Sequence, residues 1–322
     1  MEPAVLGQEH VFESQCLPVR LIVLGPERLH AAEGVSDEHA PLRVIAYRTV
    51  DNEPTQIAVQ TVNVVLDLPE ELVVPVDVLG KPVNSYDLVP KSTWKNWEGL
   101  ASAYTCKAGD AFEYWLRILR WRCNRGWIGR PEIQGFESGW GTYLKDHSTG
   151  QDIWAWHAPG RMVLRDPVSL QEWNDVQEVL ACREESPVYI DLMFDAVEQA
   201  QLGDLRRALT EAAVACEAYL RAVVIQSLPE TVVDGIRKVI DEVNVAQLVN
   251  HAFPDLLTPN QVKEYKALRS DLLTLFKLRN TILHVGDAEG VTADRCEKLL
   301  WAVSSLLAIR GENAEITVWF PK

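Results

Sequence analysis

The sequence predicts an α+β protein, in which a β-rich, sandwich-like N-terminal domain with one inserted helix precedes an all-α helical bundle. Before residue 165, short runs rich in β-branched residues are separated by Gly, Pro, Asn and Asp, which is the pattern of strands and turns. After it, apolar residues recur at helical spacing. We therefore expect a β-rich domain over 1–165, a connecting helix over 166–187 and a helical domain over 188–322.

The strands of the N-terminal domain are expected in four runs of the chain. These are LPVRLIVLG (17–25), PLRVIAYRTV (41–50), TQIAVQTVNVVLDL (55–68) and QDIWAWHAPGRMVL (151–164). Successive side chains of a strand point to opposite faces, so each of these runs can bury one side and expose the other. Segments such as GPE, DNEP and VLGKPVNS supply the turns that follow the strands.

One helix is expected to interrupt the strands over 108–131, with Asp110 as its N-cap and Gly126 as its end. It holds the most basic stretch of the chain, in which Trp residues lie between five arginines. These arginines are Arg117, Arg120, Arg122, Arg125 and Arg130. Such a stretch suits a phosphate or single-stranded nucleic-acid patch, with bases stacked on the indoles. It also suits a solvated helix face that pairs with acidic neighbours, which is the simpler interpretation because no defining motif accompanies the arginines.

The second half of the chain is expected to form helices joined by short loops. Apolar spacing indicates their bounds, together with Ser169, Thr258 and either Thr292 or Asp294 as caps. The expected ranges are 167–185, 187–229 with a break near Gly203, 230–253, 258–286 and 292–311.

Composition and motifs argue against several classes of protein. The formal net charge of −15 disfavours indiscriminate binding to nucleic acid or anionic membranes, although it leaves room for a small basic cleft. No basic-then-apolar leader, membrane-length apolar run or C-x-x-C pair is present, so we expect a cytoplasmic protein with free thiols. Phosphate-cradling glycine motifs, H-E-x-x-H and G-x-S-x-G are also absent.

One stretch, FKLRNTILHVGD (276–287), combines side chains that can do chemistry. Asn280 and His284 are four residues apart and share a helix face, whereas Arg279 and His284 diverge by about 140°. One chain can bring Arg279 and His284 together only if the helix end distorts before Gly286. Two chains can instead line one cleft with both copies of the motif. An ordinary helix end also explains these residues, because a histidine in the last turn and a glycine beyond it are favourable there.

This stretch resembles the signature of the HEPN family (higher eukaryotes and prokaryotes nucleotide-binding). In that family an arginine, a polar residue and a histidine lie near the end of a long helix, as Arg279, Asn280 and His284 are expected to. The Ala-rich segment LGDLRRALTEAAVACEAYL (202–220) is similar to the family's early helix, and the resemblance covers about 188–311. Some toxin members have a tyrosine two residues beyond the histidine, where this chain has Gly286.

The resemblance implies a defence or toxin effector that cleaves RNA without a metal or cofactor, at a site shared by a homodimer. His284 would exchange protons with the ribose 2′-hydroxyl or the leaving 5′-oxygen, Arg279 would stabilise the scissile phosphate, and Asn280 would orient the imidazole. Glu217, in the early helix, would hold Arg279 in place. Weaker candidates for nucleic-acid contacts are Lys277, Arg269, Arg117 and Arg120.

A second hypothesis is a non-catalytic module for dimerisation or ligand binding, because many HEPN members keep the motif's surroundings without nuclease action. Under the first hypothesis the N-terminal domain would sense a trigger or regulate the helical domain, and under the second it would bind a protein, nucleotide or glycan. A conventional hydrolase in the N-terminal half rests only on scattered Asp, Glu and His, whose spacing supports no site.

Overall fold

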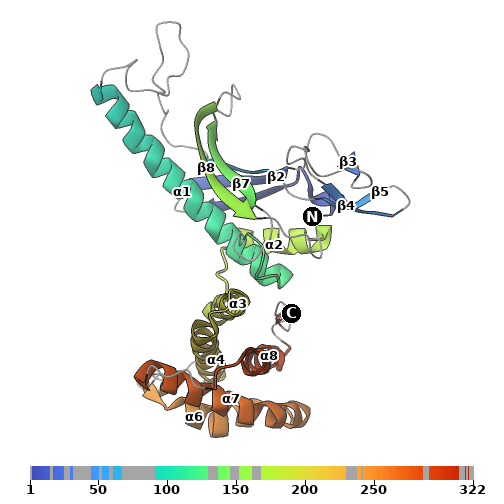
Figure 1. Ribbon diagram of the computed structural model, residues 1–322, viewed down its shortest axis with the longest axis vertical. Coiled ribbons are helices and arrows are strands. Elements are labelled where there is room, and N and C mark those ends of the chain that lie inside the picture. The colour runs from blue at the N-terminus through green and yellow to red at the C-terminus, as the bar shows by residue number, and fades with distance from the viewer. Residues whose placement is uncertain are drawn as a thin grey trace, which may run out of the picture. The chain divides into compact units, whose positions relative to one another are not determined.

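The computed structural model describes residues 2–14, 17–24, 30–31, 45–50, 53–57, 61–66, 91–129, 137–145, 152–161, 168–229, 238–240, 242–285, 290–311, 316 and 318. The chain forms two compact units, Met1–Cys123 with Gly129–Glu185 and Asn124–Ile128 with Ser186–Lys322 (Figure 1). The helix expected as a connection, α2 (Leu170–Cys182), belongs to the first unit.

Within the described residues, the first unit holds three small sheets. The first is antiparallel in the order β1-β2-β6, with β1 (Glu9–Ser14), β2 (Leu17–Leu24) and β6 (Thr61–Leu66). The second joins β3 (His30–Ala31), β4 (Ile45–Val50) and β5 (Glu53–Ile57), and the third pairs β7 (Glu137–Lys145) with β8 (Asp152–Arg161). Strands are thus confirmed in all four expected runs, while their packing as a sandwich stays a prediction.

Alternating burial along the strands builds the core of the first unit. His10 and Phe12 are buried in β1, and they lie opposite the buried Leu21 and Val19 of β2. Helices α1 (Lys91–Cys123) and α2 pack against this sheet. The described part of the first unit therefore buries one face of a small sheet beneath two helices.

Gln177 of α2 protects the outer edge of this sheet. Its side-chain amide donates a hydrogen bond to the carbonyl of Val11 at 2.9 Å and accepts one from the Val11 N–H at 2.8 Å. The amide thus takes the place that a further strand would occupy beside β1, which lies at the sheet edge.

Helix α1 begins well before the predicted start. It runs over Lys91–Cys123, so the prediction of Asp110 as its N-cap is wrong, and Asp110 lies exposed in mid-helix. The reason is that a single glycine costs a helix only about 1 kcal/mol, so neither Gly99 nor Gly109 interrupts it.

The end of α1 is also set differently from the prediction. The helix stops at Cys123, where Asn124 adopts a left-handed φ of 51°, a conformation that asparagine tolerates better than most residues. Gly126, predicted as the helix end, lies beyond it. A Cβ at Gly126 would overlap the ring of Phe194, so this glycine allows a close approach rather than ending the helix.

A buried histidine sits between two indoles in the first unit. His10 stacks on Trp173 with ring centroids 3.7 Å apart, and its Nδ1 accepts a hydrogen bond from Trp115 Nε1–H at 2.8 Å. An indole N–H can only donate, so the ring proton of His10 lies on Nε2 and is donated to the Trp173 carbonyl at 2.8 Å. Burial lowers the pKa of His10 from 6.5 to about 4, against a smaller opposite effect of the Trp173 hydrogen bond.

We expect this histidine to make the stability of the first unit depend on pH. Because the folded pKa lies below the unfolded one, the unfolded chain binds the proton more tightly. The contribution of neutral His10 to the free energy of unfolding is complete above pH 6.5. It is lost as pH falls towards about 4, by about 3 kcal/mol in all. Urea unfolding, followed by tryptophan fluorescence, gives the free energy of unfolding at pH 7.5 and at pH 4.5. This free energy should fall much less between the two pH values in His10→Gln than in the wild type. An equal fall in both proteins would contradict the assignment of the pH dependence to His10.

The second unit is helical, as expected. Its long helices in the described residues are α3 (Val188–Gln201), α4 (Leu205–Gln226), α7 (Pro259–Val285) and α8 (Ala293–Ala308). Helix α4 is central, because it packs against α3, α7 and α8 (Figure 1). Its small buried side chains, which let neighbouring helices approach closely, are Ala208, Ala212, Ala213, Ala215 and Cys216.

The segment between α4 and α7 differs from the single helix expected over 230–253. Its described part includes the short helix α6 (Val245–Gln247), the π-helical turn η4 (Leu248–Ala252) and the 3-10 turn η5 (Pro254–Leu256), whereas 230–237 lie outside the described residues. Asn244 starts a new turn, because its side chain accepts a hydrogen bond from the Ala246 N–H at 2.8 Å. Local capping thus restarts the helix where apolar spacing alone predicted continuity.

Candidate active site

Helix α7 carries the candidate motif in its last two turns and remains α-helical up to Val285. Leu275, Phe276 and Leu278 are buried, which fixes this part of the helix in the core of the second unit. Asn280 and His284, one turn apart, are both exposed to solvent. The amide and the imidazole are therefore accessible to a ligand while the helix beneath them is held firmly.

Arg279 lies on a different side of α7, against α4. Its Nη2 donates to Oε2 of Glu217 at 3.2 Å, and its Nη1 donates to Oδ1 of Asn280 at 3.3 Å. The side chain is 24% exposed, and its Nε is buried with no hydrogen-bond partner among the described residues. A buried N–H without an acceptor is costly, so the protein itself satisfies this guanidinium incompletely.

The regular helix keeps Arg279 and His284 apart within one chain. Five residues of an α-helix turn the side chain through about 500°, which leaves the two about 140° apart. The distortion that would aim both at one atom is not present, because the α-helix continues beyond His284 to Val285. The two side chains therefore leave the helix in different directions, although Nη1 of Arg279 still reaches Oδ1 of Asn280 at 3.3 Å.

Glu217 is shared between two arginines. It receives Arg279 on Oε2 and Arg221 on Oε1, the latter at 2.6 Å from Nη2. Sequence reasoning placed Glu217 beside Arg279 from the helix order but missed Arg221. The signal was available, because Glu217 and Arg221 are four residues apart on one predicted helix.

Cys216, next to Glu217, takes no part in this network. It is fully buried, and burial, followed by the charge of Glu217, raises the pKa of its thiol far above the ordinary value. Since the thiolate is the reactive form, Cys216 is a core side chain rather than a nucleophile.

The basic residues on α7 flank the motif without forming a cluster. Lys277 is exposed, three residues before Asn280. Arg269, ten residues before Arg279 on the same helix, is exposed. It donates to Oδ1 of Asn250 from Nε at 2.8 Å and from Nη2 at 2.6 Å. Lys277 alone of these two therefore lies within a turn of the candidate site.

The arginines of α1 belong to the first unit. Arg117 forms an ion pair of 3.5 Å with Glu185 and lies over the ring of Tyr114, 6.0 Å from its centroid. Arg120 is half-buried on the same helix. These contacts of Arg117 match those of a solvated helix face, and nothing in them indicates a phosphate site.

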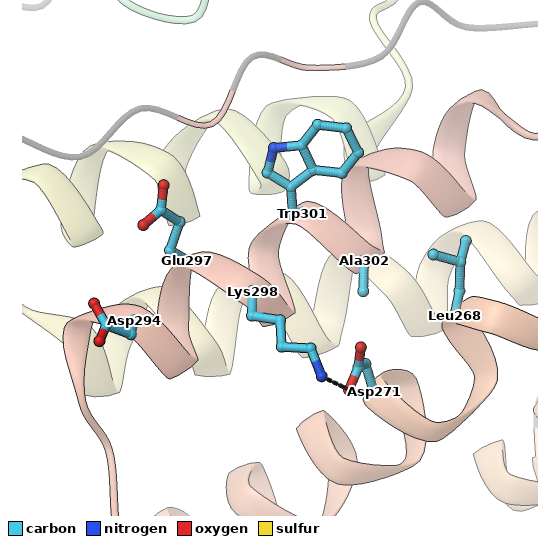
Figure 2. A pocket seen from close by; sticks show the side chains of 7 residues that line it. All are labelled: Leu268, Asp271, Asp294, Glu297, Lys298, Trp301 and Ala302. Atoms are coloured by element: carbon cyan, nitrogen blue, oxygen red, sulfur yellow. Dashed lines mark hydrogen bonds and ion pairs between the residues drawn. The ribbon is translucent and has the colours of Figure 1, made fainter.

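A separate open groove of about 520 Å³ lies between α7 and α8 (Figure 2). Its lining includes Asp271, Asp294 and Glu297, together with Trp301, which is 49% exposed. The cation that lines it, Lys298, is already paired with Asp271 at 2.7 Å. An excess of carboxylates repels phosphate, so this groove is a poorer candidate for RNA than the end of α7.

In the part of the chain that the structure describes, no three His, Cys, Asp or Glu side chains are grouped to hold a metal ion. No helix formed by these residues is both long and apolar enough to cross a membrane. Comparisons of the chain with protein-family models, with curated proteins and with solved structures find no match.

Proposed function

We propose that this chain is a metal-independent endoribonuclease of the HEPN type, a defence or toxin effector that cuts RNA at a site shared by two copies of α7. The observation that carries the proposal is the division of the motif over the helix surface. Asn280 and His284 are exposed together, while Arg279 is anchored by Glu217 on another side. Two α7 helices that face each other would bring the His284 side chains of both chains and an Arg279 guanidinium to one phosphate.

The proposed reaction uses the two histidines as base and acid. His284 of one protomer removes the proton from a ribose 2′-hydroxyl, whose oxygen attacks the adjacent phosphorus. His284 of the partner subunit donates a proton to the leaving 5′-oxygen as the phosphorus–oxygen bond breaks. The guanidinium of Arg279 stabilises the charge on the phosphate. The products are a 2′,3′-cyclic phosphate and a 5′-hydroxyl, with no water consumed in this step.

Exposed apolar side chains beside the site support a dimer. Leu283, one turn after Arg279 on α7, is 57% exposed, and Val214, one turn before Glu217 on α4, is 38% exposed. A second chain packed over the end of α7 would cover such side chains.

We expect Leu283→Asp to weaken the dimer. A carboxylate buried at the centre of an apolar contact should raise the dimer dissociation constant by about tenfold or more. Leu202→Asp, at a position 45% exposed after α3, is the matched control and should leave the constant unchanged. Sedimentation equilibrium measures both variants, and equal dissociation constants for them would contradict a dimer built on this face.

The function itself is tested with purified protein, total RNA and EDTA. The wild type should release fragments that end in 2′,3′-cyclic phosphate, detected by their resistance to 3′-end ligation until the cyclic phosphate is opened and the resulting phosphate is removed. RNA that stays as intact with the wild type as in buffer contradicts the proposal.

One observation favours the second function, a non-catalytic dimerisation module. The pairing of Arg279 with Glu217 and its partial burial are also what a structural arginine shows. Under that function, Arg279→Ala lowers the free energy of unfolding and leaves RNA unaffected in every preparation.

A further inference from the structure

Arg221 makes the best-satisfied polar contacts near the candidate site. Its Nε and Nη2 donate to Oε1 of Glu217 at 3.2 Å and 2.6 Å. Its Nη1 donates to the carbonyl of Ile240, and its Nη2 also donates to the carbonyl of Val243 at 2.9 Å. With a side chain only 19% exposed, Arg221 joins helix α4 to the segment that precedes α6.

Arg279 is held much more weakly by the same carboxylate. It has one contact of 3.2 Å with Oε2 of Glu217, and its buried Nε has no acceptor among the described residues. Two guanidinium groups thus share one carboxylate, and the cluster of Glu217, Arg221 and Arg279 carries one excess positive charge. Because the two backbone carbonyls also bind Arg221, its contact with Oε1 of Glu217 is held in place.

We propose that Arg221 is a positioning residue for Arg279, which holds the Glu217 carboxylate so that the guanidinium of Arg279 keeps its charge for an RNA phosphate. Without Arg221, Glu217 and Arg279 form a closed pair with no net charge, and a phosphate then has to compete with that carboxylate. The inference deepens the proposed ribonuclease function and rests on it for its substrate.

The chain offers a matched control on the same helix. Arg207 and Glu211 form an ion pair of 2.7 Å at the same four-residue spacing, with Arg207 60% exposed. Arg207→Ala removes the same charge from α4 as Arg221→Ala does. A difference between the two variants therefore reports the position of the arginine rather than the net charge of the protein.

The test measures binding separately from cleavage. A fluorescent 2′-O-methyl RNA oligonucleotide, which lacks the attacking hydroxyl, is titrated with full-length protein and followed by anisotropy at fixed ionic strength. Arg221→Ala should raise the dissociation constant about tenfold, as expected when one charged hydrogen bond to phosphate is lost. Arg207→Ala should change it by less than about twofold.

One further variant and a kinetic measurement distinguish positioning from folding. Arg221→Lys keeps the charge beside Glu217 but not all the donors to the carbonyls, so it should restore only part of the binding lost in Arg221→Ala. With a cleavable RNA, Arg221→Ala should raise KM and also lower kcat, because Arg279 both binds the phosphate and stabilises its charge during cleavage. A general loss of fold would lower the apparent kcat through a smaller fraction of active enzyme, leave KM unchanged, and appear in circular dichroism.

The possible outcomes separate the two proposals. If the wild type binds with the expected dependence on Arg221 but never cleaves, this inference holds and the nuclease proposal fails. If the wild type cleaves RNA and Arg221→Ala binds as Arg207→Ala does, the inference is overturned and the nuclease proposal stands. If the wild type does not bind the oligonucleotide, both are overturned.

Discussion

His284→Ala should lower the rate of RNA cleavage by about 10²–10⁴-fold, the range by which a positioned acid or base accelerates a reaction. The imidazole is exposed at the end of α7 and buries no surface whose loss would unfold the bundle. The variant should therefore fold as the wild type does. The measurement is the initial rate of fragment formation from a defined RNA in EDTA.

His251→Ala is the control for this experiment. His251 is also an exposed histidine of the second unit, in the π-helical turn η4, and it lies 33 residues before His284 in the chain. Its replacement should leave the rate within about twofold of the wild type. If His284→Ala and His251→Ala cleave equally fast, the imidazole at the end of α7 is not the catalytic group.

The local pattern of the sequence accounts for much of the fold. Period-two runs indicated strands at four places, including β2, because each strand must bury one face, and β2 does so with Val19 and Leu21. Strands β1 and β7 lie outside those four runs and were not predicted. Capping chemistry was equally readable. Ser169 forms a capping box with Glu172 at the start of α2, and Thr292 caps α8.

The predicted helix bounds were wrong where a single local residue was taken to show whether a helix continues or ends. Asp110 looks like a cap, yet the preceding residues already form a helix and the aspartate stays in it, exposed on its surface. In the segment after α4, apolar spacing suggested one helix, whereas Asn244 and Pro254 divide the described part into short turns. Both outcomes depend on packing and capping that spacing alone does not encode.

Only part of the candidate site could be predicted from the sequence, for a related reason. The divergence of Arg279 and His284 follows from helix geometry, and α7 keeps that geometry to Val285. The acceptors of Arg221 are backbone carbonyls of Ile240 and Val243, 19 and 22 residues further along the chain. Every residue has a carbonyl, so no sequence pattern marks which of them will lie beside a given arginine.

A dimer of one wild-type chain and one His284→Ala chain should retain less than about 5% of wild-type activity, because each cleavage needs one histidine as base and the other as acid. If instead each chain held a complete site, the mixed dimer would keep about half of the activity. The effect of a single altered chain therefore distinguishes a shared site from two separate ones.

The mixed dimer is obtained by co-expressing the two chains with different affinity tags and purifying on both tags in turn. A mixed dimer of wild type with His251→Ala, prepared in the same way, should be fully active and controls for the handling. The rate of RNA cleavage by the purified mixed dimer is the most direct test of a site composed of two α7 helices. We predict that the mixed dimer of wild type and His284→Ala loses nearly all of its cleavage activity. A mixed dimer that keeps half of the activity would contradict the shared site.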